Sequence, residues 1–302
     1  LGAGFGPGHK VIAGWDFVDN DPDPVDEDGH GTMVAGILAA DSYYFNGARY
    51  QGIAPGANLI ALRADSGWAE PDFSRFEQAL QWVIANRQTY NIIAINISSG
   101  DGHYLQEVGV NPLADELQAL ANAGVFIASS SGNEWGEEPG WGMDYPAADP
   151  NVVAVGAIDP SGAIADITER NQFLDLLAPG VDVAAPTFHN QTHAYITWVG
   201  TGTSFACPFV TGSAVLLKQL NPSLTSAEIL AILKNSGTDV YDPDTNLTFK
   251  RLDLDDAIAL AYSYSDDIYE DNDAKGSPTV LSFTSDRIDN DDLFYLYADR
   301  DC

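Results

Sequence analysis

The amino-acid sequence predicts an α/β protein whose central parallel sheet is covered by helices on both faces. Short, almost continuous apolar segments, typical of strands buried on both sides, alternate with longer segments whose apolar residues recur at helical spacing. This alternation of strands and helices favours a parallel sheet. The chain has 302 residues, 45% of them hydrophobic, which is enough to bury a sizeable core.

The expected elements follow one another along the chain. The apolar run 33–40 predicts a first helix, and a second helix begins behind Asp72, a residue type that favours the N-cap position. The remaining elements, in order, are strand 92–97, helix 113–121 closed by Gly124, strands 125–128 and 152–155, helix 205–220, a helix that the capping box Thr225–Glu228 opens and that runs to Gly237, and helix 252–262.

The composition changes near residue 264, where we place a domain boundary. Residues 1–263 form the expected main domain. Residues 264–302 are rich in acidic side chains and include the aromatic segment 293–297, so we expect an acidic linker that leads into the start of a small C-terminal β region. This segment is too short for an ordinary independent domain.

The charge balance excludes several classes of partner. The 13 Lys and Arg residues are outnumbered by 44 Asp and Glu residues, which gives a net charge of −31. Such a field repels phosphate backbones and anionic lipid headgroups, so we expect no nucleic-acid partner. No stretch approaches the length of a membrane span, so we expect no membrane insertion. The two cysteines give no disulfide framework, and Cys207, in an apolar run, is expected to be a small buried residue.

Three short motifs carry side chains that could perform catalysis. His30 lies between two glycines at the start of an apolar helix, where its ring can reach into a cleft. Ser204 opens the helix 205–220, and the positive end of a helix dipole favours a developing oxyanion. Asn133 follows the strand 125–128 and could present its NH₂ group to that oxyanion. Taken singly, each has a structural alternative: a capping or core histidine, a serine N-cap, and a turn-forming Asn.

In this order, the motifs Asp-Gly-His30-Gly-Thr, Ser-Gly-Asn133-Glu and Gly-Thr-Ser204-Phe-Ala-Cys-Pro resemble those of the subtilisin-like serine proteases. The resemblance extends over about residues 1–262. It implies that His30 is the general base, that Ser204 is a nucleophile that forms an acyl-enzyme, and that Asn133 is the oxyanion-hole side chain. It also implies that Ser98, Ser99 and Gly100 form the strand edge on which an extended substrate lies.

The resemblance further implies a secreted, extracellular serine endopeptidase that acts on peptide or protein substrates. It implies no cofactor for catalysis, and we expect a monomer. The α/β-hydrolases are excluded as an alternative, because their nucleophile elbow needs glycine where Ala206 stands and their histidine follows the serine. A catalytically impaired binding protein on the same scaffold is the remaining alternative; the retention of His30, Ser204 and Asn133 argues against it.

One departure from the family pattern concerns the acid of the triad. The family carries it in an Asp-Thr-Gly or Asp-Ser-Gly well before the histidine motif, and no such tripeptide precedes His30. Asp16 is only 14 residues before His30 and matches a later family segment. We therefore expect the catalytic Asp and its strand to lie upstream of Leu1, with Asp16 as the candidate if they do not.

Other residues suggest sites more weakly. The acidic segment Asp19–Asp28 is either a solvated loop or a structural calcium site, which is common in this family, and the metal ligands stay unassigned. His189 and His193 lack the intervening Glu of a zinc helix, so a solvated loop is favoured. The glycines of segment 2–8 lack the flanking strand and helix of a dinucleotide site. The tail resembles the start of a pre-peptidase C-terminal domain.

Overall fold

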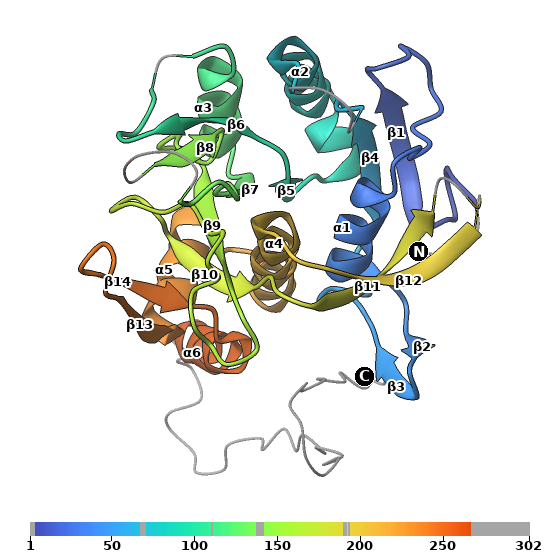
Figure 1. Ribbon diagram of the computed structural model, residues 1–302. Helices are drawn as coiled ribbons and strands as arrows, with labels where there is room; N and C mark the ends of the chain where they lie inside the picture. The colour runs from blue at the N-terminus through green and yellow to red at the C-terminus, as the bar shows by residue number, and fades with distance from the viewer. Residues whose placement is uncertain are drawn as a thin grey trace, which may run out of the picture.

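The centre of the molecule is a six-stranded sheet with the order β13-β14-β10-β9-β7-β5 (Figure 1). The computed structural model describes residues 4–66, 71–109, 111–136, 142–189, 192 and 194–266. Neighbouring strands are parallel except for β13 and β14. The strands are β5 (Ala94–Ile97), β7 (Phe126–Ser130), β9 (Val153–Ile158), β10 (Leu176–Pro179), β13 (Thr238–Asp242) and β14 (Leu247–Arg251). The predicted α/β fold is confirmed.

Helices cover both faces of this sheet. Side chains alternate along β7, so that Phe126 and Ala128 pack with α4, α5 and α6, whereas Ile127 packs with α2 and α3. α4 is largely buried and contacts four strands of the sheet. The helices are α1 (His30–Ala39), α2 (Phe73–Tyr90), α3 (Ala114–Asn122), α4 (Thr203–Leu220), α5 (Ser226–Ser236) and α6 (Leu254–Asp266).

Local sequence signals explain where several helices begin. The Asp72 side chain accepts a hydrogen bond from the Ser74 N–H and caps α2, as the sequence predicts. Thr225 and Glu228 form both hydrogen bonds of the capping box that opens α5. α6 continues through Asp266, across the expected boundary at 264. The expected C-terminal β region lies in residues that the structure does not describe, so that expectation stays a prediction.

A second parallel pair, β1 (Val11–Asp16) and β4 (Leu59–Arg63), lies next to the central sheet but is separate from it. Leu62 of β4 and Ile95 of β5 pack against the same apolar cluster, yet the two strands do not pair. Both strands are half-buried, whereas the inner strand β7 is fully buried. Within the described residues, β4 and β5 therefore each keep one edge without a strand partner.

Three antiparallel pairs complete the described part of the fold. One of them, β11 with β12, packs against α1 and so supports the helix that His30 begins. The paired strands are β2 (Tyr43–Phe45) with β3 (Ala48–Tyr50), β6 (Asp101–Tyr104) with β8 (Met143–Tyr145), and β11 (Val183–His189) with β12 (Ala194–Gly200). Across the residues that were described, none of the helices combines the length and the apolar character needed to cross a membrane.

Candidate active site

The motifs of Asn133 and Ser204 meet, together with Ser98, at the carboxyl-terminal edge of the central sheet. Ser98 directly follows β5, Asn133 follows β7, and Ser204 is the second residue of α4. The carboxyl ends of parallel strands share one edge of a sheet, where open α/β sheets usually bind their ligands. The fold thus places chain segments far apart in sequence around the N-terminus of α4.

Ser204 lies in the first turn of α4 but does not cap it. The N-cap residue is Gly202, and no side chain of the cap residue bonds to the helix. The Ser204 hydroxyl instead donates to the Ser98 carbonyl oxygen at 3.2 Å, and the Ser98 hydroxyl donates to the Ser204 carbonyl oxygen at 2.7 Å. The alternative that Ser204 is a simple N-cap is therefore wrong, and its oxygen is held at the junction of β5 and α4.

Asn133 is tied to the residue that precedes Ser204. Its Oδ1 accepts hydrogen bonds from the Thr203 backbone N–H at 2.8 Å and from the Thr203 hydroxyl at 3.1 Å. The side-chain oxygen thereby satisfies a backbone donor in the first turn of α4, which the helix itself leaves unpaired. The NH₂ group is the other end of the same amide, so it is available to an acyl oxygen at Ser204.

His30 is the first residue of α1, and a strained turn sets its position. Gly29, the N-cap residue, has φ +103°, and a Cβ atom there would lie 2.1 Å from the Phe188 carbonyl oxygen. Only glycine fits this position. The His30 ring packs against Phe205, the residue after Ser204, with ring centroids 5.7 Å apart.

The electrostatic surroundings of His30 favour its neutral form. Desolvation by the surrounding protein lowers the pKa of the imidazole, against the raising effect of Asp28, Asp26 and Asp65. The residue is nevertheless in contact with solvent, because His30 is exposed by surface area. No hydrogen bond joins the imidazole to a carboxylate among the described residues, so the described part of the chain orients this ring by packing alone.

Asp26 holds the turn in front of His30. Its Oδ1 accepts from the Gly29 backbone N–H at 2.7 Å, and its Oδ2 accepts from both the Thr32 N–H and the Thr32 hydroxyl at 2.7 Å. These bonds lower the pKa of Asp26 although burial opposes them. From the sequence, Asp26 was treated only as part of the acidic segment Asp19–Asp28. An Asp three residues before a Gly that leads into a helix is the sequence signal that could have indicated its capping role.

The segment Ser98–Gly100 leaves its backbone available. The Ser99 hydroxyl donates to Asp65 at 2.8 Å, and the Ser98 hydroxyl is bound to Ser204, so both side chains are occupied. Ser99 and Gly100 make no backbone hydrogen bond to another described segment. A free backbone edge beside Ser204 is the arrangement that lets an extended peptide add as a strand.

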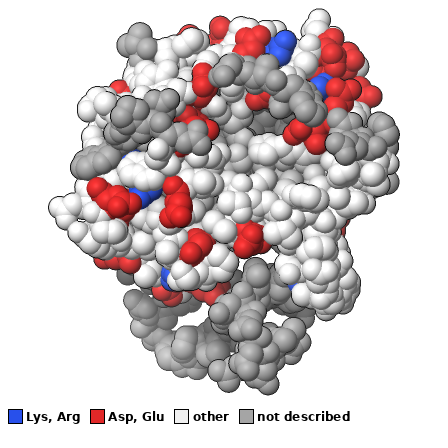
Figure 2. Space-filling model, in the orientation of Figure 1, with Lys and Arg blue, Asp and Glu red and all other residues white. Residues whose placement is uncertain are grey.

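The acidic segment after β1 is organised by an arginine. Arg63 binds Asp16 at 2.7 Å, and it binds Asp19 and Glu27 at 2.9 Å each. In Figure 2, acidic side chains gather over this corner of the molecule. The arginine supplies positive charge to Asp19 and Glu27, two of the six acidic residues in the segment Asp19–Asp28. A calcium site in this segment stays a prediction.

The Asp16 carboxylate binds the same arginine. Its carboxylate is 1% exposed and accepts hydrogen bonds from Arg63 and from the Val18 and Asp19 N–H groups. These bonds lower its pKa against the opposing effect of burial. None of the hydrogen bonds of Asp16 leads to His30, so the structure gives no support to Asp16 as the acid of the triad.

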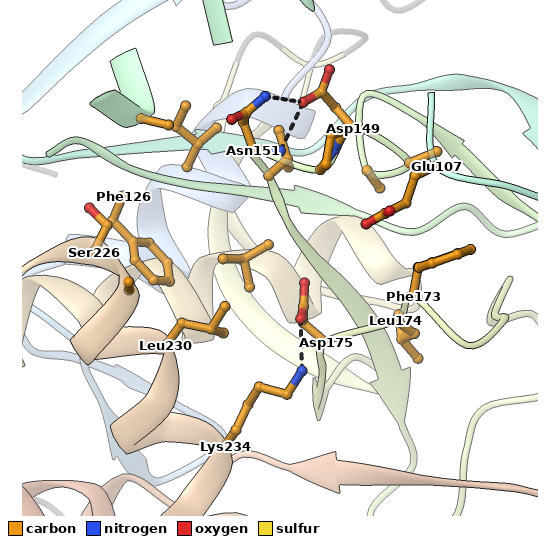
Figure 3. Close-up of a pocket in the computed structure, with 18 of the residues that line it drawn as sticks. Glu107, Phe126, Asp149, Asn151, Phe173, Leu174, Asp175, Ser226, Leu230 and Lys234 are labelled. Atoms are coloured by element: carbon orange, nitrogen blue, oxygen red, sulfur yellow. Dashed lines mark hydrogen bonds and ion pairs between the residues drawn. The ribbon is translucent and has the colours of Figure 1, made fainter. Parts of the chain in front are cut away.

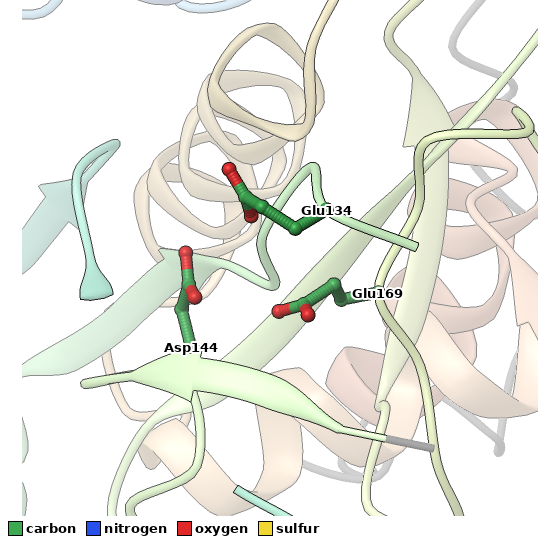
Figure 4. Close-up of side chains that lie close together, drawn as sticks. All are labelled: Glu134, Asp144 and Glu169. Carbon is green, nitrogen blue, oxygen red and sulfur yellow. The ribbon is translucent and has the colours of Figure 1, made fainter. Parts of the chain in front are cut away.

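A cluster that sequence reasoning missed lies next to Asn133. The side chains of Glu134, Asp144 and Glu169 point toward one another (Figure 4), and each offers a carboxylate oxygen within 4.8 Å of the others. Burial is the largest cause that raises the pKa of Asp144, to about 9, and Glu169 and Glu134 add to it. The three acids are far apart in sequence, so only the fold brings them together; Glu134, directly after Asn133, was the available signal.

A separate cavity of about 480 Å³ lies at the opposite end of the strands (Figure 3). Its lining includes Phe126, Val153 and Asp175, at or just before the starts of β7, β9 and β10, and Asp175 binds Lys234 at 2.9 Å. It contains none of the candidate catalytic residues. Elsewhere, Cys207 is fully buried, as predicted, and His189 binds Thr192, while His193 lies outside the described residues.

Comparisons with known proteins identify the family of the chain. The model of the subtilase family matches residues 8–252. Subtilisin BL of Lederbergia lenta is 32% identical over 232 residues, which are 77% of this chain and 78% of that protein. Subtilisin E of Bacillus subtilis is 30% identical over 233 residues, 77% of this chain and 57% of its own length. A solved cold-adapted subtilisin-like serine proteinase is 27% identical with a TM-score of 0.64, and the match covers 80% of each chain.

The family match spans most of the chain and contains the motifs of His30, Asn133 and Ser204. The chain therefore belongs to the subtilase family and is a serine endopeptidase, a hydrolase of peptide bonds.

Proposed function

We propose that the protein is a secreted endopeptidase that cleaves peptide bonds through an acyl-enzyme on Ser204, with His30 as general base. The observation that supports this most is the pair of hydrogen bonds between Ser204 and Ser98, together with the bond from the Thr203 N–H to Asn133, at the N-terminus of α4. The His30 ring lies against the neighbouring Phe205. Catalysis by these groups needs no cofactor.

In the proposed reaction, the Ser204 hydroxyl turns from the Ser98 carbonyl toward His30. His30 takes the hydroxyl proton as Oγ forms a bond to the substrate carbonyl carbon. The resulting oxyanion accepts hydrogen bonds from the Asn133 NH₂ and the Ser204 backbone N–H, at the positive end of α4. The carbon–nitrogen bond then breaks, and His30 gives its proton to the leaving amine. Water, deprotonated by His30, then attacks the acyl carbon; the bond from the acyl carbon to the Ser204 Oγ breaks, and His30 returns the proton to Oγ.

Substrate binding follows from the free edge at Ser98, Ser99 and Gly100. We propose that an extended peptide or protein segment pairs with this backbone, so that its scissile carbonyl reaches Ser204. Backbone pairing is independent of side chains, and it suits many sequences. We expect the enzyme to act as a monomer.

The triad still requires an acid. We propose that it is an Asp upstream of Leu1, on a strand that pairs with the open edges of β4 and β5. Two observations support this: those edges are apolar and half-buried, and no carboxylate among the described residues is hydrogen-bonded to the His30 imidazole. An apolar strand edge without a partner is otherwise a liability, because other chains can pair with it.

The experiment compares the 302-residue chain with a chain extended upstream through that strand, both assayed on one peptide substrate. Without the acid, nothing fixes the His30 tautomer, so kcat/KM of the shorter chain should be about 10⁴-fold lower, the scale of this family's triad template. Equal values would mean that an acid within the 302 residues completes the triad. Recovery of the activity from the culture medium of the source cells tests secretion.

The alternative is a catalytically impaired binding protein on the same scaffold. In the extended chain, Ser204→Ala should reduce kcat by about 10⁶-fold, because only the oxyanion hole and substrate binding would remain. Proteolysis that is undiminished by this substitution would exclude Ser204 as the nucleophile. An extended chain that binds peptides without cleaving them would support the alternative.

A further inference from the structure

The acidic cluster beside Asn133 extends the proposed function, on which the following inference rests. We propose that Glu134, Asp144 and Glu169 bind the positively charged side chain of the substrate residue whose carbonyl Ser204 attacks, the P1 residue. The enzyme would then cleave after arginine or lysine.

The cluster lies where that side chain must go. Asp144 packs against Gly100, the end of the proposed substrate edge: a Cβ atom on Gly100 would lie 2.9 Å from the Asp144 Cβ. Glu169 and Asp144 also pack against Gly132, where a Cβ would lie 2.2 Å from the Glu169 Oε2. Gly132 directly precedes Asn133. The carboxylates thus lie between the substrate edge and the residue that would hold the scissile oxygen.

The second observation is an unpaired buried oxygen. Glu169 is 0% exposed; its Oε1 binds the His103 Nδ1 at 2.8 Å, and its Oε2 has no hydrogen-bond partner when Asp144 is ionised, whereas a protonated Asp144 can donate to Glu169. Asp144 is 8% exposed, so two acidic side chains are removed from water, and His103 is the one described basic side chain bonded to them. Such a group carries a desolvation cost that a positive ligand would offset. The Glu169 Oε2 and the Asp144 carboxyl carbon both lie next to Gly132, so this oxygen lies within the cluster.

The arginine next to the cluster in sequence binds other acidic residues. Arg170, next to Glu169 in sequence, binds Asp242 at 2.7 Å and Asp244 at 3.0 Å, and its guanidinium stacks 3.8 Å from the centre of the Trp135 ring. His103 is the one basic side chain bonded to the cluster among the described residues. A guanidinium matches this cluster because its planar set of donors can serve two carboxylates at once.

A binding experiment tests this site without relying on catalysis. We expect benzamidine, an aromatic mimic of the arginine side chain, to bind the 302-residue chain at least about 10-fold more tightly than the neutral benzamide, as measured by isothermal titration calorimetry. The double variant Asp144→Asn/Glu169→Gln should lose this preference. Because it removes buried carboxylates rather than apolar packing, it should fold, which circular dichroism checks.

Glu107→Gln is the matched control, since it removes one negative charge from an exposed residue outside the cluster. It should bind benzamidine as the parent chain does. Equal binding of benzamidine and benzamide, or an unchanged preference in the double variant, would overturn the proposal. Calcium binding that the double variant abolishes, without any benzamidine binding, would also overturn it and would indicate a metal site.

The kinetic counterpart uses two peptides that differ only at P1, one with arginine and one with citrulline, its neutral analogue. In the upstream-extended chain, kcat/KM should favour arginine by at least about 100-fold, the scale of a lost buried charge-assisted contact. Equal rates would contradict the inference while leaving the peptidase function intact. Failure of the peptidase function would instead appear as the absence of cleavage of every peptide and of reaction at Ser204, with benzamidine binding unaffected.

Discussion

At the scale of single residues, Asn133 shows how one side chain can serve both structure and catalysis. Its Oδ1 caps the first turn of α4 through the Thr203 N–H, and its NH₂ is assigned to the oxyanion. Asn133→Ala should therefore lower kcat by about 10²–10³-fold and also cost about 1 kcal/mol of stability. Enzyme kinetics and thermal unfolding of the extended chain measure the two effects.

The control is Asn133→Asp, which keeps an oxygen at the cap and removes the NH₂. It should restore the stability, because a carboxylate is favourable at a helix N-terminus, and it should leave kcat low. If Asn133→Asp restored kcat as well, the amide would not act on the oxyanion. If Asn133→Ala left the unfolding midpoint unchanged, the cap would contribute nothing.

Asp26 acts through the turn that positions His30. Asp26→Ala removes acceptors from the Gly29 and Thr32 N–H groups, so it should cost about 1 kcal/mol and lower kcat with little change in KM. The folded-state pKa of Asp26 is lowered, so its stabilisation is present above the unfolded pKa of about 3.9 and is lost as the pH falls through the folded value. Urea unfolding of both proteins at pH 3 and pH 6 should show a smaller difference at pH 3.

For Asp144, the dependence of stability on pH has the opposite sign to that for Asp26. Its pKa is raised to about 9 by burial first and then by Glu169, Glu134 and Asp101, while His103 from β6 faces Glu169. The folded state keeps a proton that the unfolded state releases above pH 4, so Asp144 lowers stability as the pH rises toward 9. Asp144→Asn should therefore raise the melting temperature at pH 8, and the gain should disappear near pH 4.

The same titration governs the proposed cation site. A guanidinium binds the ionised cluster, so the ratio of kcat/KM for the arginine peptide to that for the citrulline peptide should rise from pH 6 to pH 9. The ratio cancels the contribution of His30, whose ionisation affects both substrates alike. If the ratio did not change over this pH range, the ionisation of Asp144 and Glu169 would have no effect on substrate binding, contrary to this prediction.

At the scale of elements, the sequence predicted the apolar strands β5, β7 and β9 and the capped helices, because these depend on local patterns, but it did not predict the buried strand β10. β7, α2 and α5 follow from an apolar run, from Asp72 and from the Thr225 box. The short pairs β2–β3 and β6–β8 were not predicted, since their residues carry no clear alternation. The separation of β1 and β4 from the main sheet was not visible either, because it depends on which strand lies between β4 and β5.

The open edges of β4 and β5 make a prediction about stability. Extension upstream through the proposed strand should raise the melting temperature and lower light scattering on heating, because it covers apolar edges that other chains can otherwise pair with. Replacing the Asp of that strand by Asn should keep both gains while leaving kcat/KM low. If the extended chain melted and scattered like the 302-residue chain, the strand would not occupy this position.

At the scale of the whole molecule, the net charge of −31 opposes the compact state through self-repulsion. Raising sodium chloride from about 10 mM to about 500 mM shortens the screening distance from about 30 Å to a few ångström, so it should raise the melting temperature. The charge-changing control Glu107→Gln should reduce this salt effect only slightly, because it removes one charge of many. A melting temperature that fell with salt would mean that ion pairs such as Arg63–Asp16 outweigh the repulsion.

The candidate site was predicted from sequence only in part. The three motifs gave His30, Ser204 and Asn133, whereas the roles of Asp26, Asp16 and Arg63 required coordinates. The acidic cluster could not be predicted, because Glu134, Asp144 and Glu169 come from three separate segments and meet only through the close approach at Gly132. Spatial convergence of like charges leaves no local pattern in a sequence.

The central claim is that Ser204 is a nucleophile activated by His30. A fluorophosphonate that reacts only with activated serines tests it directly, with the labelled residue located by peptide mass spectrometry. In the upstream-extended chain we predict rapid labelling of Ser204 alone, and loss of that labelling in His30→Ala. Labelling of another serine, or equal labelling of Ser204 with and without His30, would contradict the claim.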